Sequence, residues 1–216
     1  PSAAANTAGL LTGVGLLTGI IGVGTAWLVA TANFPGRRFF DWALLLPLAI
    51  PTYILAYASL DLLHPLGPIQ SALRAFLGIS DPRALHFPEL RSMGGAIFLL
   101  GFVLYPYVYL AARASFLMQN AAALEAARVL GAGRGEVFFR VALPLARPAI
   151  VIGVTLALIE ALNDIGATEF LGVRTLTIAI YSTWLNRSSL PGAAQISLFM
   201  LTLVILLFLL ERWARK

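Results

Sequence analysis

Cysteine is absent from the 216 residues, and charged side chains make up only 12% of them. Without cysteine the chain can form no disulfide, thiolate metal site or cysteine nucleophile. A soluble domain usually carries about a quarter charged residues, so this low charge and a mean hydropathy of +0.86 favour an integral membrane protein. Position 1 is not methionine, and no basic segment precedes the first apolar run. We therefore expect a fragment or a processed product rather than a signal peptide.

Two further absences bear on function. No G-x-x-x-x-G-K-[ST] phosphate loop occurs, so we expect no ATP site, no cofactor and no catalytic residue in this chain. The net charge is +5, but no basic surface interleaved with aromatic residues is present for nucleic acid. His64 and His86 share a loop with Asp81 and Glu89, and hard ligands of this kind suit iron. Their spacing fits no known metal site, so we expect structural roles and no resident metal.

The sequence does contain long apolar stretches. A membrane-spanning helix needs about 20 apolar residues, and no alternating pattern of a membrane β-barrel appears. The second stretch contains Pro47 and Pro51, which should kink its helix. Residues 175–186 are apolar but too short, so we expect an interfacial or re-entrant segment. We predict a single all-α, polytopic transmembrane bundle of about five spans, at residues 8–32, 42–60, 93–112, 149–168 and 191–210.

The basic residues, 14 of them arginine, are distributed unevenly between the connections. Five spans place connections alternately on the two sides of the membrane. One side then receives ten basic residues, in the connection 37–38, the loop 118–147 with Arg113 before it, and the C-terminus. The other side receives five. Because cytoplasmic loops carry the excess of arginine and lysine, we expect the loop 118–147 and the C-terminus in the cytoplasm, and the N-terminus outside.

Two carboxylates accompany the fourth span. The uncharged run that begins at Pro148 is too short to cross, so we expect the helix to continue to about Thr168 and to include Glu160 and Asp164. Residues four apart share one helix face, which Asn163 borders. Glu160 would then lie near the middle of the membrane, where a charge is costly unless it faces protein or water. The pair is either a set of hydrogen-bonded core carboxylates or part of a path that favours cations.

Tyrosines occur as two pairs with the same spacing, Tyr53 with Tyr57 and Tyr105 with Tyr109. Aromatic belts at the membrane surface explain most such tyrosines, and a relay of phenolic ligands for iron is the alternative. The candidate translocation path predicted from these two patterns consists of Glu160, Asn163, Asp164, Tyr53 and Tyr57.

The central stretch "EAARVLGAGRGEVFFRVALPLARP" is charged although apolar sequence lies on both sides of it. Asn120 can cap an alanine-rich helix that Gly131 and Gly133 end. A short second helix follows, and the prolines of "LPLARP" are expected to turn the chain into the next span. The residues alone leave two interpretations open: a helix that docks into a partner's groove, or an amphipathic hairpin on anionic lipid.

The spacing within this stretch resembles the EAA loop of permease subunits of bacterial ATP-binding-cassette (ABC) importers. That pattern is Glu-Ala-Ala, three residues, glycine, nine residues, an aliphatic residue, any residue, and Leu-Pro. It is matched by Glu125, Ala126, Ala127, Gly131, Val141, Leu143 and Pro144. The resemblance implies a bacterial inner-membrane protein whose loop contacts a cytoplasmic ATPase dimer, which binds the ATP. It also implies a periplasmic substrate-binding protein and a second permease half or subunit as partners.

Three further stretches resemble bacterial iron(III) importer permeases: "NFPGRRFFDWALLLPLAIPTYILAYASLDLL", "LYPYVYLAARASF" and "ALNDIGATEFLGVRTLTIAIY". This implies iron(III) as the substrate. The chain would be the N-terminal half of a fused permease with its first helix trimmed, or a half-size subunit. Permeases for thiamine, sulfate, molybdate and polyamines share the loop and are alternatives. From other classes, we considered an ion-coupled secondary transporter with Glu160 and Asp164 as its ion site, and a small membrane anchor. An anchor needs neither the prolines nor the carboxylates.

Overall fold

The computed structural model describes residues 2–79, 81, 88–119, 129 and 131–214, and within these ranges it contains helices and no strand. This confirms the predicted all-α class. Four helices are long: α1 (Ser2–Thr31), α5 (Met93–Met118), α8 (Leu143–Asn163) and α11 (Leu190–Ala214). The shorter helices are α2 (Arg37–Ala43), the 3₁₀ turn η1 (Leu46–Ala49), α3 (Thr52–Leu62), α4 (Pro68–Leu77), α7 (Arg134–Val137), the π-helical turn η2 (Phe138–Ala142), α9 (Gly166–Phe170) and α10 (Leu176–Leu185).

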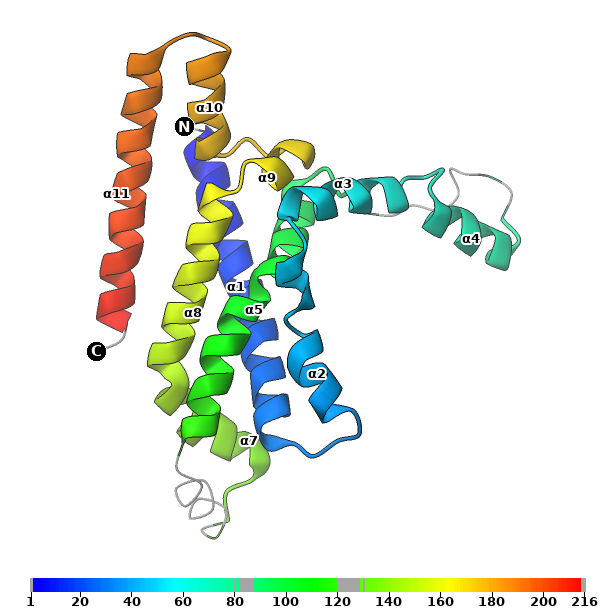
Figure 1. The fold of residues 1–216 in the computed structure, drawn as a ribbon, viewed down its shortest axis with the longest axis vertical. Helices are drawn as coiled ribbons and strands as arrows, with labels where there is room; N and C mark the ends of the chain where they lie inside the picture. The colour runs from blue at the N-terminus through cyan, green and yellow to red at the C-terminus, as the bar shows by residue number, and fades with distance from the viewer. Residues whose placement is uncertain (1, 80, 82–87, 120–128, 130, 215–216) are drawn as a thin grey trace.

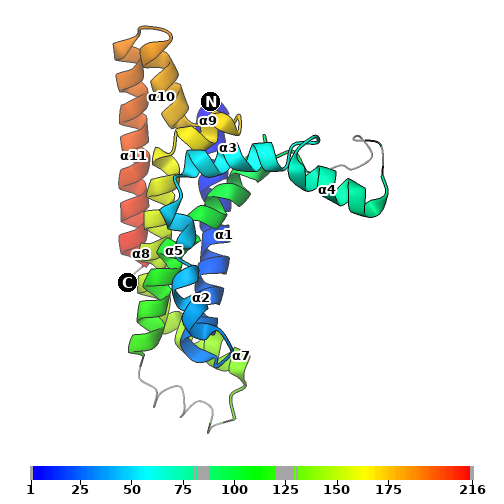
Figure 2. The ribbon, with the colours of Figure 1, turned by 45° about the vertical axis from the view of Figure 1, so that its right-hand side comes forward.

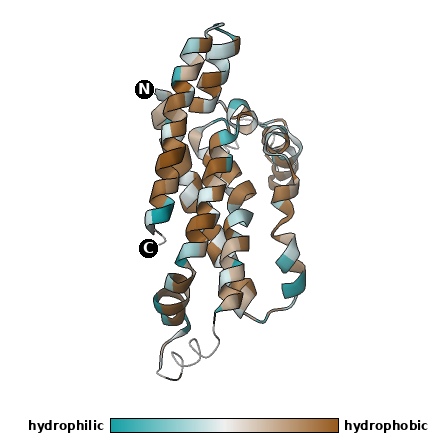
Figure 3. Cartoon of the chain, turned by 60° about the vertical axis from the view of Figure 1, so that its left-hand side comes forward, coloured by the Kyte–Doolittle hydropathy of each residue, from teal (hydrophilic) through white to brown (hydrophobic). Residues whose placement is uncertain are grey.

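The centre of the molecule is a bundle of α1, α5 and α8, which run side by side (Figure 1). Two clusters of buried apolar side chains lie among them, one around Leu100 and Leu104 and the other around Val108 and Tyr109. Helix α11 packs against α10 and α8 at the edge of the bundle. Figure 3 shows hydrophobic ribbon along most of the long helices and hydrophilic patches mainly near their ends. This arrangement is that of a membrane-spanning bundle with a narrow core.

Two ends of the bundle can be distinguished in Figures 1 and 2. The α7 end carries α2 and α7, and the α9 end carries α3, α9 and the N-terminus. Within the described residues, four helices are long and apolar enough to cross a membrane, and counting α2–η1 with α3 as one bent span makes up to five. The predicted bundle of about five spans is therefore confirmed, although the second crossing is not a straight helix.

The second span is broken at its two prolines. The segment Arg37–Ala49 and helix α3 meet at an angle of 93°. Proline removes a backbone donor and clashes with the preceding turn, so a helix interrupted by Pro47 and Pro51 cannot continue straight. Helices α3 and α4 therefore run away from the bundle, across its α9 end (Figures 1 and 2). The predicted kink is present as a right-angled turn.

The predicted turn at "LPLARP" is wrong. The chain runs through η2 directly into α8, which has Pro144 in its first turn and Pro148 inside the helix. The wider π-helical turn joins the two helical segments. Residues Arg134–Asn163 thus form one 30-residue apolar helical unit, which is long enough to cross without Asp164.

Gly22 brings α1 into contact with the backbone of α5. A Cβ atom on Gly22 would lie 2.6 Å from Val108 Cβ and 2.9 Å from the carbonyl oxygen of Tyr105. We expect Gly22→Leu to force the helices apart and to destabilise the bundle by about 1–3 kcal/mol, the usual cost of overpacking. The matched control is Gly24→Ala in the same helix, where a Cβ atom meets nothing within 4 Å. Thermal unfolding in detergent should separate the two variants, and equal melting temperatures would contradict the close packing of α1 on α5.

Candidate functional site

The predicted partner-binding loop is only partly within the described residues. Glu125, Ala126 and Ala127 lie outside them. Gly131 is described, and its φ of +90° lies in the left-handed region that favours glycine. Leu143 and Pro144 are placed in the first turn of α8, at the α7 end of the bundle. The described part of the pattern thus contains a glycine with left-handed backbone angles, followed by the start of a spanning helix.

The chain after Gly131 is fixed by local polar contacts and by aromatic packing. Gly133 precedes α7 as its N-cap, and its backbone N–H donates to the Glu136 carboxylate at 3.2 Å, as in a capping box. The Phe138 ring lies 5.1 Å from the Trp27 ring of α1 and 6.5 Å from the Phe116 ring of α5, measured between centroids. The second half of the loop is therefore packed onto the ends of two bundle helices.

Asp164 lies outside α8, contrary to the prediction. The helix ends at Asn163, and Asp164 leaves it with extended backbone angles (φ −70°, ψ 117°). Its Oδ1 atom accepts hydrogen bonds from the backbone N–H groups of Ala167 at 2.8 Å and Thr168 at 3.2 Å. Aspartate is among the preferred residues for satisfying the free N–H groups at a helix start, which explains why the chain changes from α8 to α9 here. Glu160 and Asp164 therefore do not share one helix face.

The same carboxylate joins α8 and α9 to the broken span. Asp164 Oδ2 accepts a hydrogen bond from the Thr52 hydroxyl at the start of α3. The next residue of α3, Tyr53, packs its Cβ atom against Gly166, and the Tyr57 ring lies 6.0 Å from the Phe170 ring of α9. Three of the five residues predicted to line a path, Asp164, Tyr53 and Tyr57, therefore meet at the α9 end of the bundle.

Glu160 and Asn163 are exposed in the last turn of α8. Glu160 precedes the helix end by three residues, which is about 4.5 Å at 1.5 Å per residue. Glu160 lies within α8, as predicted, and its depth in the membrane stays a prediction. The carboxylate interacts electrostatically with Tyr107 of α5. Tyr53 and Tyr57 are 51% and 62% exposed, so four of the five predicted path residues are accessible on this chain.

Tyr105 and Tyr109 lie in the core of the bundle and not in an aromatic belt at its surface. They are 5% and 0% exposed and hold the broken span in place. The Tyr105 hydroxyl donates to the Leu44 carbonyl oxygen at 2.8 Å, and the Tyr109 hydroxyl donates to the Asp41 carbonyl oxygen at 3.1 Å. These carbonyls lie where α2 ends and its helical hydrogen bonds stop, so buried donors are needed there.

Asp41 and Arg113 are functional candidates that the sequence reasoning missed. Arg113 of α5 forms an ion pair with Asp41 of α2 through Nε, and its Nη2 atom donates to Asp41 Oδ2 at 2.7 Å. The Tyr109 hydroxyl donates to Oδ1 of the same carboxylate at 3.1 Å. A signal was available: Asp41 interrupts a run of aromatic and apolar residues, and an ionisable residue at the edge of a span calls for a partner.

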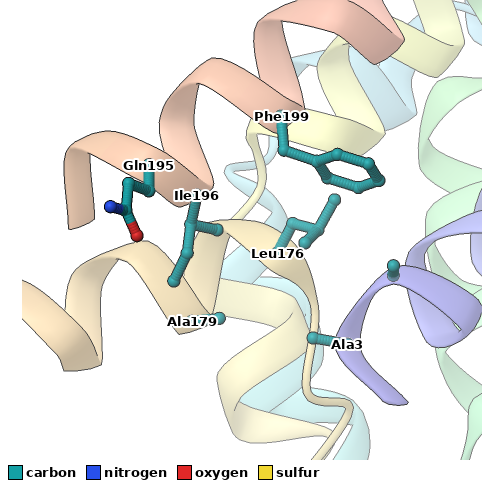
Figure 4. Close-up of a pocket in the computed structure, with 7 residues that line it drawn as sticks. Ala3, Leu176, Ala179, Gln195, Ile196 and Phe199 are labelled. Atoms are coloured by element: carbon teal, nitrogen blue, oxygen red, sulfur yellow. The ribbon is translucent and has the colours of Figure 1, made fainter. Parts of the chain in front are cut away.

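No group of three or more histidine or acidic residues that could hold a metal ion occurs within the described ranges. His86 lies outside them. The Nδ1 atom of His64 accepts a hydrogen bond from the Leu66 backbone N–H at 3.2 Å, which is a local structural role. A cavity of about 420 Å³ lies where the start of α1 meets α10 and α11 (Figure 4). None of the predicted site residues lines it, and Gln195 is the one polar residue in its lining.

Residues 19–216 match the profile of the family described as "Binding-protein-dependent transport system inner membrane component". The chain belongs to this family. It is a permease subunit of an ABC importer in the bacterial inner membrane, and a transport subunit rather than an enzyme. The EAA-loop resemblance is thus confirmed at the level of the family.

Among relatives of this permease, the molybdenum transport system permease protein ModB of Escherichia coli (strain K12) is 31% identical over 201 residues, which are 90% of this chain and 84% of ModB. The probable sulfate transport system permease protein cysT of Chlorokybus atmophyticus is 32% identical over 152 residues, 70% of this chain and 50% of that protein. Neither is an iron(III) permease, so these relatives give no support to the predicted iron(III) substrate.

Solved structures support the fold. A bacterial alginate ABC transporter, in complex with an alginate pentasaccharide-bound periplasmic protein, matches 99% of this permease and 76% of its own chain with a TM-score of 0.76. At 18% identity this similarity shows the fold alone. The overall path of the chain is therefore shared with a solved ABC transporter structure.

Proposed function

We propose that this permease forms half of a translocation pathway and that its loop 118–147 docks on a cytoplasmic ATPase. The observation that carries this proposal is the matched spacing from Glu125 through Gly131 to Leu143 and Pro144. Within that pattern, Gly131 has the left-handed backbone, and the Leu-Pro pair begins α8. ATP hydrolysis takes place on the partner, and movement of the loop is passed to the bundle.

The sidedness follows from the arrangement of the ends. Segments 37–38 and 134–147, which carry the excess of arginine, belong to the α7 end of the bundle. We place that end in the cytoplasm by the positive-inside bias. The α9 end, with α3 and α9, then faces the periplasm and receives substrate from a binding protein.

A second permease half completes the pathway. The exposed side chains of Tyr53, Tyr57, Glu160 and Asn163 lie at the end of the bundle where α8 ends and α3 packs on α9. Polar and aromatic groups at this depth are costly in lipid unless protein or water covers them. We therefore propose that these four side chains face the translocation path. The second permease half would lie opposite them, and α11 would face lipid.

The proposal also concerns which substrate the permease transports. The relatives named above transport molybdenum and sulfate, so a tetrahedral oxyanion such as molybdate or sulfate is the first candidate. Iron(III) is the second candidate, because the exposed Glu160 carboxylate favours a cation and three sequence stretches resemble iron(III) permeases. An oxyanion path would keep Glu160 away from the substrate.

Uptake by the reconstituted complex distinguishes the two substrates. The complex, isolated with its ATPase and binding protein, is placed in proteoliposomes with ATP in the lumen, and labelled molybdate, sulfate and iron(III) are offered outside. We expect ATP-dependent uptake of an oxyanion, with Glu160→Gln leaving that uptake unchanged or raising it. Uptake of iron(III) alone, lowered by Glu160→Gln, would reverse the order of the candidates.

A further inference from the structure

We propose that the Asp41–Arg113 pair is a positioning contact that passes movement of the loop 118–147 to the broken second span. This inference rests on the proposed function. The pair joins α2, the first part of the broken span, to the last two turns of α5, the helix that leads directly into the loop.

Helix α2 depends on polar contacts for its place in the bundle. No residue of α2 or of the following turn η1 is buried. The polar contacts between this segment and α5 include the Asp41–Arg113 pair and the hydrogen bonds from the hydroxyls of Tyr109 and Tyr105. Apolar contact with the core comes after the end of α2, where the partly buried Leu44 and Leu45 pack against the cluster around Val108 and Tyr109. The position of α2 therefore follows the position of the α5 side chains that bind it.

The end of α5 also holds the beginning and the end of the loop. Gln119, which follows the last residue of α5, donates from Nε2 to the Ala142 carbonyl oxygen at 2.9 Å, just before α8. One turn earlier, the Phe116 ring packs on Trp27 and Phe138. One turn before that, Arg113 binds Asp41. A displacement of the loop would therefore move the last turns of α5, and Arg113 in these turns contacts α2.

The chemistry of the pair suits this role. Arg113 donates one hydrogen bond through Nη2 to Asp41 Oδ2, and its Nε lies within ion-pair distance of Oδ1 without making a hydrogen bond. The planar guanidinium restricts the orientation of this contact more than a lysine ammonium would. Both side chains are about a third exposed, 30% for Arg113 and 37% for Asp41, so they can rearrange without complete desolvation. Beyond the pair, α2 leads through the break at Pro47 and Pro51 to α3 at the α9 end. The pair thereby connects the loop to the opposite end of the bundle.

The test separates positioning from stability by comparing single and double neutral variants. In proteoliposomes containing the whole complex, uptake and ATP hydrolysis are measured together for Asp41→Asn, Arg113→Gln and the double variant. We expect each single variant to lower uptake by roughly tenfold while ATP hydrolysis continues, so that more ATP is consumed per substrate. Arg113→Lys should recover uptake only in part. Arg38→Gln, which removes another arginine from α2, should transport normally.

The double variant is decisive. Removing both partners leaves no unpaired charge, so thermal stability in detergent should return towards that of the wild type. If the pair positions α2, the double variant stays uncoupled although it is stable. If the double variant recovers uptake together with stability, the pair is structural and the inference is wrong. If the wild-type complex shows no ATP-dependent uptake, it is the proposed function that fails.

Discussion

Replacing Gly131 by valine should lower ATP-driven uptake by about tenfold or more while leaving the bundle folded. Gly131 has a φ of +90°, and a β-branched residue there carries a backbone strain of about 1–3 kcal/mol. The chain would relieve this strain by leaving the left-handed conformation, which redirects the segment before α7. Because the bundle core lies elsewhere, the expected loss is in coupling and not in stability.

Two variants control this result. Gly131→Asn should retain most of the uptake, since asparagine tolerates the left-handed region. Gly78→Val introduces the same strain at the end of α4, where φ is +68° and nothing lies within 4 Å of the added Cβ atom, and should leave coupling intact. Uptake, ATP hydrolysis and co-purification of the ATPase are measured for all three. Normal uptake by Gly131→Val would remove the loop from the coupling mechanism.

Asp164→Ala should be the most disruptive change at the α9 end. It removes the acceptor of the Ala167 and Thr168 backbone N–H groups and of the Thr52 hydroxyl, so three donors lose their partner at once. Loss of a helix cap alone costs about 0.5–2 kcal/mol, and the freed α3 should lower uptake as well. Asp164→Asn retains an acceptor oxygen and should lose much less.

The matched control for this position is Glu169→Ala, which removes an exposed carboxylate from α9, the helix whose first N–H groups Asp164 binds. Melting temperature in detergent and uptake in proteoliposomes are compared for the three variants. A melting temperature for Asp164→Ala equal to that of Glu169→Ala would show that the contact with Thr52 and α9 is unimportant. If Asp164→Asn lowers uptake and melting temperature as much as Asp164→Ala does, the negative charge of Asp164 is required and its acceptor oxygen alone is not sufficient.

The sequence predicted the features that depend on composition and on local chemistry. Apolar stretches of spanning length predicted the long helices, and Pro47 and Pro51 predicted the break. Glycine at position 131 indicated the end of a helix, and the described φ agrees with a backbone that requires glycine. These features were predictable because unsatisfied backbone groups are costly in lipid and because each residue type allows only certain backbone conformations.

The errors arose where tertiary contacts override local signals. Pro144 and Pro148 were interpreted as a turn, but the preceding π-helical turn lets the helix continue through them. That error extended the fourth span to about Thr168, whereas α8 ends at Asn163 and leaves Asp164 outside the helix. Asp41 and Arg113 are 72 residues apart, so no local pattern pairs them, and only the fold brings the two side chains together.

The most direct test of the account is whether ATP hydrolysis alone drives transport. The complex with its ATPase and binding protein is reconstituted into proteoliposomes, and substrate uptake is measured with ATP in the lumen, with a non-hydrolysable analogue, and with an ion gradient but no nucleotide. We predict uptake with ATP only, and its loss in Gly131→Val. Uptake driven by the ion gradient in the absence of ATP would contradict the account and would favour a secondary carrier.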